Sequence, residues 1–245
     1  MYKLNSNQEL VLSALAKICQ RGPMPSTGKG DMAVGKTLLD LLGVPQETTR
    51  KPTFQNITLT TRRSFKNKPS TRVNLFAMVP KWSLSKCKSS QEIALRYGYD
   101  RDGARKLYAS VRSRLPNSQG LFLYVDRSEK VLRERYLSVH SGDPEEVAAW
   151  RLADLQSRLL DRHPASAWIT ATVFGDSFHY RYVQFTEKPR VELLPDLIQQ
   201  GIVTMDHLIE IKDGRSTEKG PLFKIDPENI SSIFQESPRY DLMNY

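Results

Sequence analysis

The chain has 245 residues, of which 39% are hydrophobic, which suffices for one sizeable core or two closely packed lobes. No apolar run approaches the ~18 residues of a membrane span and the N-terminus has no signal-peptide profile, so we expect a cytoplasmic protein that does not contact a membrane. A formal net charge of +9 favours a polyanionic partner without identifying it.

The first elements that the sequence predicts are two helices and a strand. Apolar residues recur at helical spacing over residues 8–20, and Gly22 and Pro23 then end the helix. Within it, Cys19 falls on the apolar side, which favours a buried free thiol over a metal ligand. An amphipathic helix over 34–42 follows, and the alternating segment 54–60 predicts a half-buried strand.

Residues 30–37 match the pattern of a phosphate-binding loop, Gly-x4-Gly-Lys-Thr. Such a loop joins a buried strand to a helix, whereas residues 21–29 are polar and interrupted by prolines. We therefore favour a flexible glycine entry into the helix, with Lys36 facing DNA phosphate or solvent. A P-loop NTP-binding protein stays an alternative function.

The middle of the chain predicts a strand, a linker and two helices. Residues 71–80 indicate a second core strand, and the polar segment 83–90 indicates a linker. A capped helix over 90–99 follows, and a second helix is predicted over 103–115. A helix-turn-helix is an alternative interpretation, and a weaker one because such helix pairs are common in α/β proteins. In it, four arginines would face a DNA groove: Arg101, Arg105, Arg112 and Arg114.

Basic residues are concentrated between positions 50 and 114. This stretch holds sixteen Lys and Arg residues against three acidic ones, and the later part of the chain is much closer to neutral. A solvated basic face is the ordinary explanation of such a run. An imbalance sustained over one continuous stretch nevertheless favours a phosphate-binding surface.

The second half of the chain predicts, in order, a strand pair, a long amphipathic helix, a hairpin, a helix and a strand. Their ranges are 120–125 with 130–139, 145–161, 167–174 with 178–185, 193–200, and 202–211. His163 and His179 are too isolated to suggest a metal pair, so we expect structural or solvent-facing roles for both.

The helix and strand within residues 30–63 carry the main functional clue. A glycine-led helix with the phrase GKTLLDLL before an alternating strand resembles the catalytic segment of MutH-type mismatch-repair nickases and of the MvaI/BcnI restriction endonucleases. In that family the helix carries an acidic residue, and the strand carries Asp, four residues, Glu, one residue, Lys. The corresponding positions hold Leu39, Thr53, Thr58 and Thr60.

None of these four residues can do the chemistry that the resemblance implies. A divalent cation that activates water needs at least two carboxylate ligands, and a threonine hydroxyl is neutral and weakly coordinating. Asp40 lies about 100° round the helix from Leu39 and is a poor substitute. We therefore expect a pseudo-nuclease with no metal, cofactor or catalytic residue. The alternatives are a misplaced register, a deliberate knockout, and an active Mg²⁺-dependent, sequence-specific endonuclease whose carboxylates have moved to Asp31 or Asp40.

A second resemblance lies near the C-terminus. A helix, a strand, a polar loop within 212–225 and the phrase Gly-Pro-x-x-Lys-Ile over 220–225 are similar to the end of BcnI-like enzymes, in which the loop reaches base edges. Histidines of the family fall near Ala77 and Leu222, so base readout must differ or be weaker here. The phrase Arg-Tyr-Gly-Tyr over 96–99 is similar to one between the lobes of these endonucleases.

The resemblance implies an α/β fold of the restriction-endonuclease-like, PD-(D/E)XK class, with a mixed central sheet flanked by helices and a DNA-recognition lobe. We expect a single domain over 1–245, with a nuclease-like core at 1–82 and a recognition lobe plus returning core elements at 83–245. Double-stranded DNA is the expected partner, in recognition or regulation within a restriction or defence system that includes a catalytic nuclease or another subunit. The residues expected to bind DNA are Lys36, Arg62, Arg63, Lys66, Lys68, Arg72, Arg101, Arg105, Arg215, Lys219 and Lys224.

Overall fold

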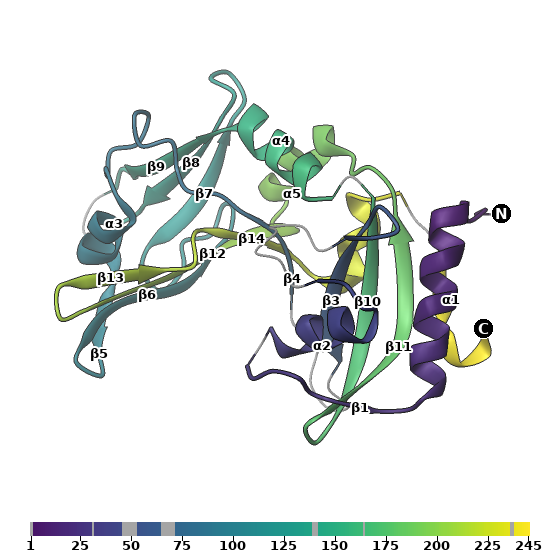
Figure 1. Cartoon of the computed structure of the whole chain (residues 1–245). Helices are drawn as coiled ribbons and strands as arrows, with labels where there is room; N and C mark the ends of the chain where they lie inside the picture. The colour runs from purple at the N-terminus through teal and green to yellow at the C-terminus, as the bar shows by residue number, and fades with distance from the viewer. Residues whose placement is uncertain are drawn as a thin grey trace. The chain divides into compact units, whose positions relative to one another are not determined.

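The computed structural model describes residues 2–30, 32–45, 53–64, 72–138, 142–163, 165–235 and 238–245 (Figure 1). The chain divides into two compact units. Unit 1 comprises Met1–Thr71, Arg162–Pro189 and Phe234–Tyr245, and unit 2 comprises Arg72–Asp161 and Arg190–Ile233. The boundary expected from the sequence falls after residue 82, whereas the first boundary between the units along the chain falls after Thr71. No helix in the described ranges is long and apolar enough to cross a membrane.

Unit 1 is built on a six-stranded mixed sheet. Its elements are α1 (Ser6–Gln20), β1 (Met24–Pro25), α2 (Ala33–Leu41), β2 (Thr53–Phe54), β3 (Ile57–Ser64), β10 (Ser166–Phe174), β11 (Ser177–Thr186), β15 (Arg239–Asp241) and a 3-10 helix, Leu242–Asn244. The strand order is β1-β11-β10-β3-β2, with β15 paired to β11. Figure 1 shows β3, β10 and β11 next to one another. Strands β3 and β10 run parallel, and the other pairs are antiparallel. The predicted helices over 8–20 and 34–42 and the predicted hairpin over 167–185 are confirmed.

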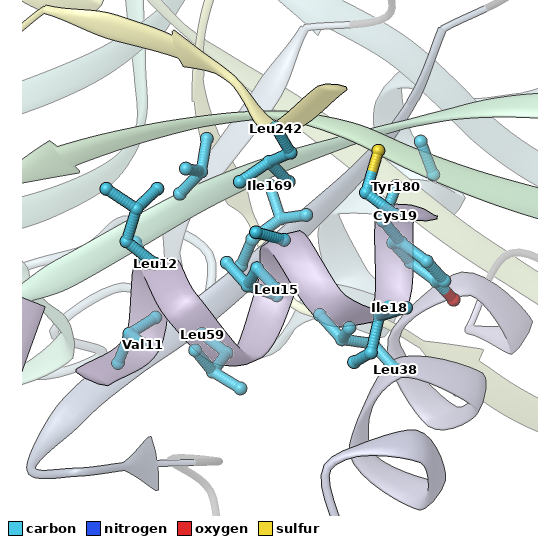
Figure 2. Close-up of a cluster of buried hydrophobic side chains, with 14 of the residues drawn as sticks. Val11, Leu12, Leu15, Ile18, Cys19, Leu38, Leu59, Ile169, Tyr180 and Leu242 are labelled. Carbon is cyan, nitrogen blue, oxygen red and sulfur yellow. The ribbon is translucent and has the colours of Figure 1, made fainter. Parts of the chain in front are cut away.

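The core of unit 1 lies between this sheet and the helices α1 and α2. Helix α1 begins with a capping box, in which the Asn5 side chain accepts from the Gln8 backbone at 2.9 Å and the Gln8 side chain accepts from the Asn5 backbone at 3.0 Å. Leu12 and Leu15 on α1 are fully buried and pack in one cluster with Ile169 of β10 (Figure 2). We call the opposite side of this sheet the outer face.

The segment predicted as a single strand over 54–60 is a hairpin. Gln55 and Asn56 have φ angles of 52° and 59°, the pair of left-handed conformations that a type I′ turn requires. No glycine marks this turn, so the alternation of side chains alone suggested one strand. The turn places Thr53 of β2 directly opposite Thr58 of β3.

Unit 2 contains a six-stranded sheet and a three-stranded sheet. Its helices are α3 (Ser90–Tyr97), α4 (Leu152–Arg162, ending in unit 1), α5 (Leu194–Gln199) and the 3-10 helices Val191–Leu193 and Pro227–Ser232. Its strands are β4 (Val73–Ala77), β5 (Tyr99–Arg101), β6 (Ala104–Val111), β7 (Leu121–Asp126), β8 (Val131–Tyr136), β9 (Glu145–Arg151), β12 (Val203–Lys212), β13 (Arg215–Glu218) and β14 (Leu222–Ile225). The larger sheet has the order β4-β14-β12-β6-β5, with β13 paired to β12, and the smaller has the order β7-β8-β9.

The helix predicted over 103–115 is wrong, because this segment contains strand β6. Asp102 and Gly103 have φ angles of 54° and 70°, so they turn the chain and pair β5 with β6. Ala104, Leu107 and Val111 are buried. Burial at intervals of three and four residues imitates the buried face of a helix. The helix-turn-helix alternative is wrong for the same reason.

The helix predicted over 145–161 is correct only in its second half. Strand β9 occupies the first half, and its residues from Val147 to Trp150 are all buried. A short run that is buried on both faces shows no alternation, so its pattern does not distinguish a strand from a helix. Helix α4 begins at Leu152 and buries Leu155 and Leu159.

Gly98 follows helix α3 at a place without room for a side chain. A Cβ there would lie 2.4 Å from the carbonyl oxygen of Ala94 and 2.5 Å from that of Lys106. Because both atoms are backbone, we expect Gly98→Ala to lower the free energy of unfolding by about 1–3 kcal/mol, measured by urea denaturation. Gly142→Ala is the matched control, because a Cβ at Gly142 would meet no atom within 4 Å. Equal losses in both variants would contradict this packing.

Candidate functional site

The hairpin β2–β3 brings together three of the four positions at which the resemblance places catalytic residues. Ile57 and Leu59 belong to the core cluster beneath α1 and α2. Alternation along the strand therefore puts Thr58 and Thr60 on the outer face. Thr53 shares that face, because it is the direct partner of Thr58 across the hairpin. Three neutral hydroxyl groups stand together at these positions.

The partners of Thr58 and Thr60 on the neighbouring strand provide no carboxylate. On β10, Ser166 pairs with Thr58 and Trp168 pairs with Thr60. Thr58 has 1% of its surface exposed, and the hydroxyl of Thr60 is buried without a hydrogen-bond partner. Within the described residues, no group of three or more His, Cys, Asp or Glu could hold a metal ion. The donor set does not fit Mg²⁺, which prefers carboxylate oxygens, so we assign no metal-dependent step to this face.

The fourth position, Leu39, is not on the outer face. Leu39 is partly buried against the core cluster on the helix side of the sheet. Its neighbour Asp40 is exposed and accepts a hydrogen bond from the hydroxyl of Thr27, in the segment before α2. Asp31, the other carboxylate of the active-endonuclease alternative, lies outside the described residues. Asp40, near the end of α2, is thus engaged with the segment that precedes this helix rather than with the threonines.

The residues that match a phosphate-binding loop have a different local structure. Gly35, Lys36 and Thr37 lie inside α2, which already begins at Ala33. A phosphate-binding loop instead presents free backbone N–H groups ahead of its helix. The hydroxyl of Thr37 is buried and accepts a hydrogen bond from the backbone of Thr27 at 3.0 Å. This geometry weighs against nucleotide binding and leaves Lys36 exposed on the helix.

Arg62 and Arg63 follow on β3 and point to opposite faces of the sheet. On the outer face, Nε of Arg62 donates to the hydroxyl of Thr170 on β10 at 2.8 Å. On the helix side, Arg63 donates to the carbonyl of Gly30, and its guanidinium lies 5.4 Å from the centre of the Phe178 ring. Alternation therefore separates two residues that the sequence presents as one basic pair. Lys66 and Lys68, which are also expected to bind DNA, lie outside the described residues.

In unit 2, two residues expected to bind DNA converge on one acid. Nη2 of Arg72 donates to both carboxylate oxygens of Asp206, at 2.9 and 3.0 Å, and Nζ of Lys224 lies 2.8 Å from the second oxygen. Ser110 donates a further hydrogen bond at 2.7 Å. Burial disfavours the ionised acid, but the hydrogen bonds from Lys224 and Ser110 and the charge of Arg72 hold the pKa of Asp206 below its usual value. The cluster carries a net positive charge. Asp206 is not among the residues predicted from the sequence, although an acid inside an apolar strand is a usable signal.

The end of strand β12 and strand β13 form a hairpin, of which β13 is exposed. Asp213 and Gly214, with φ angles of 50° and 72°, make its two-residue turn, so the polar loop expected within 212–225 is largely strand. Arg215 and the rest of β13 are exposed, and so is Lys219. Because β12 also pairs with β6 along this stretch, β13 is an exposed edge strand of the sheet and not half of a free two-stranded ribbon.

Arg105 has a structural role beside helix α3. Its guanidinium donates to the carbonyls of Ala94 and Leu95, in the last turn of the helix, and to the carboxylate of Asp100. Because its guanidinium makes these three contacts, Arg105 stabilises the fold. Arg101, in contrast, is exposed at the end of β5.

The two positions near which family histidines fall are neighbours. Ala77 on β4 and Leu222 on β14 are direct partners in the antiparallel ladder. Both are half-buried, and neither side chain has a hydrogen-bonding group. Side-chain hydrogen bonds to a base are therefore impossible at both positions.

The model of the MvaI/BcnI restriction endonuclease family matches residues 12–234. The chain belongs to this family. Its fold is similar to that of MvaI in complex with its cognate DNA substrate, with a TM-score of 0.80 and 20% sequence identity over 98% of this chain and 100% of that chain. The structure of MvaI in the absence of DNA matches with a TM-score of 0.59 and 18% identity over 98% and 99% of the two chains. No curated protein matches.

Membership of the MvaI/BcnI family confirms the predicted restriction-endonuclease-like α/β fold. The β2–β3 hairpin can then be compared with the catalytic segment that the resemblance implies. The type I′ turn brings face to face Thr53 and Thr58, the two positions at which the resemblance places Asp and Glu. The hairpin is present in this chain, and the acidic pair is not.

Proposed function

We propose that this MvaI/BcnI family member binds double-stranded DNA and does not cleave it unaided. Its role is DNA recognition or regulation within a restriction or defence system, in which a catalytic nuclease or another subunit is its partner. No divalent cation takes part in this role, because the residues at the positions of a metal cage have no negative charge.

The hairpin β2–β3 is the observation that carries this proposal. Metal-dependent hydrolysis of a phosphodiester needs carboxylates to hold the cation and a group that orients the attacking water. Thr53, Thr58 and Thr60 share one face but supply neither. With Thr58 buried and Thr60 half-buried, a shift of the backbone rather than a side-chain rotation would be needed to bring in other ligands.

Three features support binding of duplex DNA. The related MvaI structure is a complex with cognate DNA, and this chain shares its fold. The chain carries a net charge of +9, which suits a phosphate backbone. The exposed edge strand β13 presents Arg215 next to its turn with β12 and is followed by the exposed Lys219, so both cations are open to a phosphate backbone.

Salt-dependent binding of a labelled duplex tests this proposal, with fluorescence anisotropy as the measurement. We expect Arg215→Gln and Lys219→Gln each to weaken binding and to reduce the slope of log affinity against log salt by about 0.9, the contribution of one phosphate contact. Lys17→Gln is the matched control, because Lys17 is exposed on α1 and loses the same charge. It is expected to bind as the unmodified protein does. A duplex affinity that does not respond to salt would contradict the proposal.

A further inference from the structure

The outer face of the unit 1 sheet carries a row of polar side chains that crosses four strands. Arg62 on β3 is the direct partner of Thr170 on β10, and Thr170 is the direct partner of Tyr182 on β11. At the far end of the row, the guanidinium of Arg239 on β15 lies 4.0 Å from the centre of the Tyr182 ring. Two arginines that are far apart in sequence therefore flank one threonine and one tyrosine.

Arg62 has no counter-ion in the part of the chain that the structure describes. Its only hydrogen bond there is the one from Nε to Thr170, and its Nη1 is buried without a partner. Burial, and then the charge of Arg239, lower the pKa of Arg62, so its surroundings disfavour the cation that it carries. Arg239 is exposed, so this end of the row is open to solvent. Two cations in such a place are stabilised when an anion joins them.

The acid next to this row is already engaged. Asp241 on β15 is the direct partner of Tyr182. Arg181 donates to it from Nη2 at 2.9 Å, and the backbone of Met243 donates to its other oxygen at 3.1 Å. The row therefore keeps a net positive charge after Asp241 is counted.

We infer that Arg62 and Arg239 together bind one phosphate group of the DNA backbone on the outer face, beside the threonines of the β2–β3 hairpin. This inference rests on the proposed function. In a metal-dependent nuclease a bound cation neutralises the phosphate. Here two guanidinium groups supply that charge, and a guanidinium binds phosphate through paired N–H donors. Thr60 stands two residues before Arg62 on the same face, with a buried hydroxyl that has no partner.

Affinity for a labelled duplex is the first test. We expect Arg62→Gln and Arg239→Gln each to weaken binding about tenfold, the loss typical of one charge-assisted contact. The double variant is expected to lose little more than either single variant, because both side chains act on one phosphate. Lys17→Gln, which removes a charge from the opposite side of unit 1, is expected to bind like the unmodified protein. Fully additive losses would place the two arginines on separate phosphates and overturn the shared site.

Thermal unfolding in inorganic phosphate is the second test, and it needs no DNA. A ligand that binds only the native state raises the melting temperature. Compared with chloride at equal ionic strength, phosphate is expected to raise the melting temperature of the unmodified protein and of Lys17→Gln, but not of Arg62→Gln. In chloride alone, Arg62→Gln is expected to be at least as stable as the unmodified protein, because it removes an unpaired, half-buried charge. A less stable variant in chloride would indicate that Arg62 has only a structural role.

The two tests separate failure of this site from failure of the proposed function. If the unmodified protein does not bind duplex DNA but phosphate still stabilises it through Arg62, the ligand is free phosphate and the proposed function is wrong. If the unmodified protein binds DNA and both arginine variants match it, the phosphate site is wrong and the proposed function stands.

Discussion

Duplex DNA incubated with the purified protein and Mg²⁺ or Mn²⁺ is expected to stay intact, although the protein binds it. Thr53, Thr58 and Thr60 offer no carboxylate to hold a cation and no lysine to orient water. The missing chemistry corresponds to a rate difference on the order of 10⁶-fold or more. Gel analysis of a supercoiled plasmid and of a duplex library, each with and without metal, measures both nicking and double-strand cleavage.

A variant with carboxylates and a lysine in the hairpin tests the reason given for the expected lack of cleavage. Thr53→Asp, Thr58→Glu and Thr60→Lys together are expected to create Mg²⁺ binding, measured by calorimetry, because the hairpin sets the three side chains on one face. The uncharged set Thr53→Asn, Thr58→Gln and Thr60→Met is the matched control and is expected to bind no Mg²⁺. Sequence alone favours adding Leu39→Glu. The structure argues against it, because Leu39 packs against the apolar core and a charge there is costly.

One result would reverse this interpretation. If the unmodified protein gives a site-specific cleavage product, and Asp40→Asn or Asp31→Asn abolishes it, then the protein is an active endonuclease with relocated carboxylates. Loss of cleavage without loss of DNA binding in those variants would locate the metal site near α2.

Glu134→Ala is expected to lower the free energy of unfolding by about 3–5 kcal/mol, the usual loss when one partner of a buried ion pair is removed. Glu134 on β8 and His207 on β12 are almost completely buried, with 0% and 1% of their side-chain surface exposed, and Nε2 of His207 lies 2.8 Å from Oε1 of Glu134. The pair joins the two sheets of unit 2. Without Glu134, a buried imidazole loses its only hydrogen-bond partner in the described structure.

The stability that this pair contributes is expected to depend on pH. Burial lowers the pKa of His207, but the charge and hydrogen bond of Glu134 outweigh it, so the pKa is raised above 6.5. A raised pKa means that the folded state holds the proton more tightly than the unfolded state. The contribution is therefore complete below about pH 6.5 and is lost as the pH rises through the folded-state pKa. Urea denaturation at a series of pH values measures this loss.

A paired replacement separates the cost of breaking this interaction from its net value. Glu134→Met combined with His207→Leu removes both charges and the buried atoms that lack partners, Nδ1 of His207 and Oε2 of Glu134. We expect this double variant to be more stable than Glu134→Ala and to lose the pH dependence assigned to His207. The prediction fails if the double variant keeps the pH dependence of the unmodified protein.

Local patterns predicted many elements because they depend on neighbouring residues alone. The capped, apolar stripe of α1 and the strands β10 and β11 around Gly175 have periods that a few residues reveal. Strand β9 was predicted as a helix because both of its faces are covered, which removes the alternation of a half-buried strand. Strand β6 was predicted as a helix because its buried residues recur at intervals of three and four. The turn at Gln55 and Asn56 was missed because it contains no glycine.

The sequence by itself determined that threonine, and not Asp, Glu or Lys, stands at positions 53, 58 and 60, because this is a matter of residue identity at a fixed spacing. Only the tertiary structure decided which side chains act together. In the tertiary structure Leu39 lies on the other side of the sheet from the threonines. Arg105 donates hydrogen bonds to α3. Arg62 lies in one row of side chains with Arg239. Such groupings depend on pairing between strands far apart in the chain, and no local pattern records which face of a sheet those strands will share.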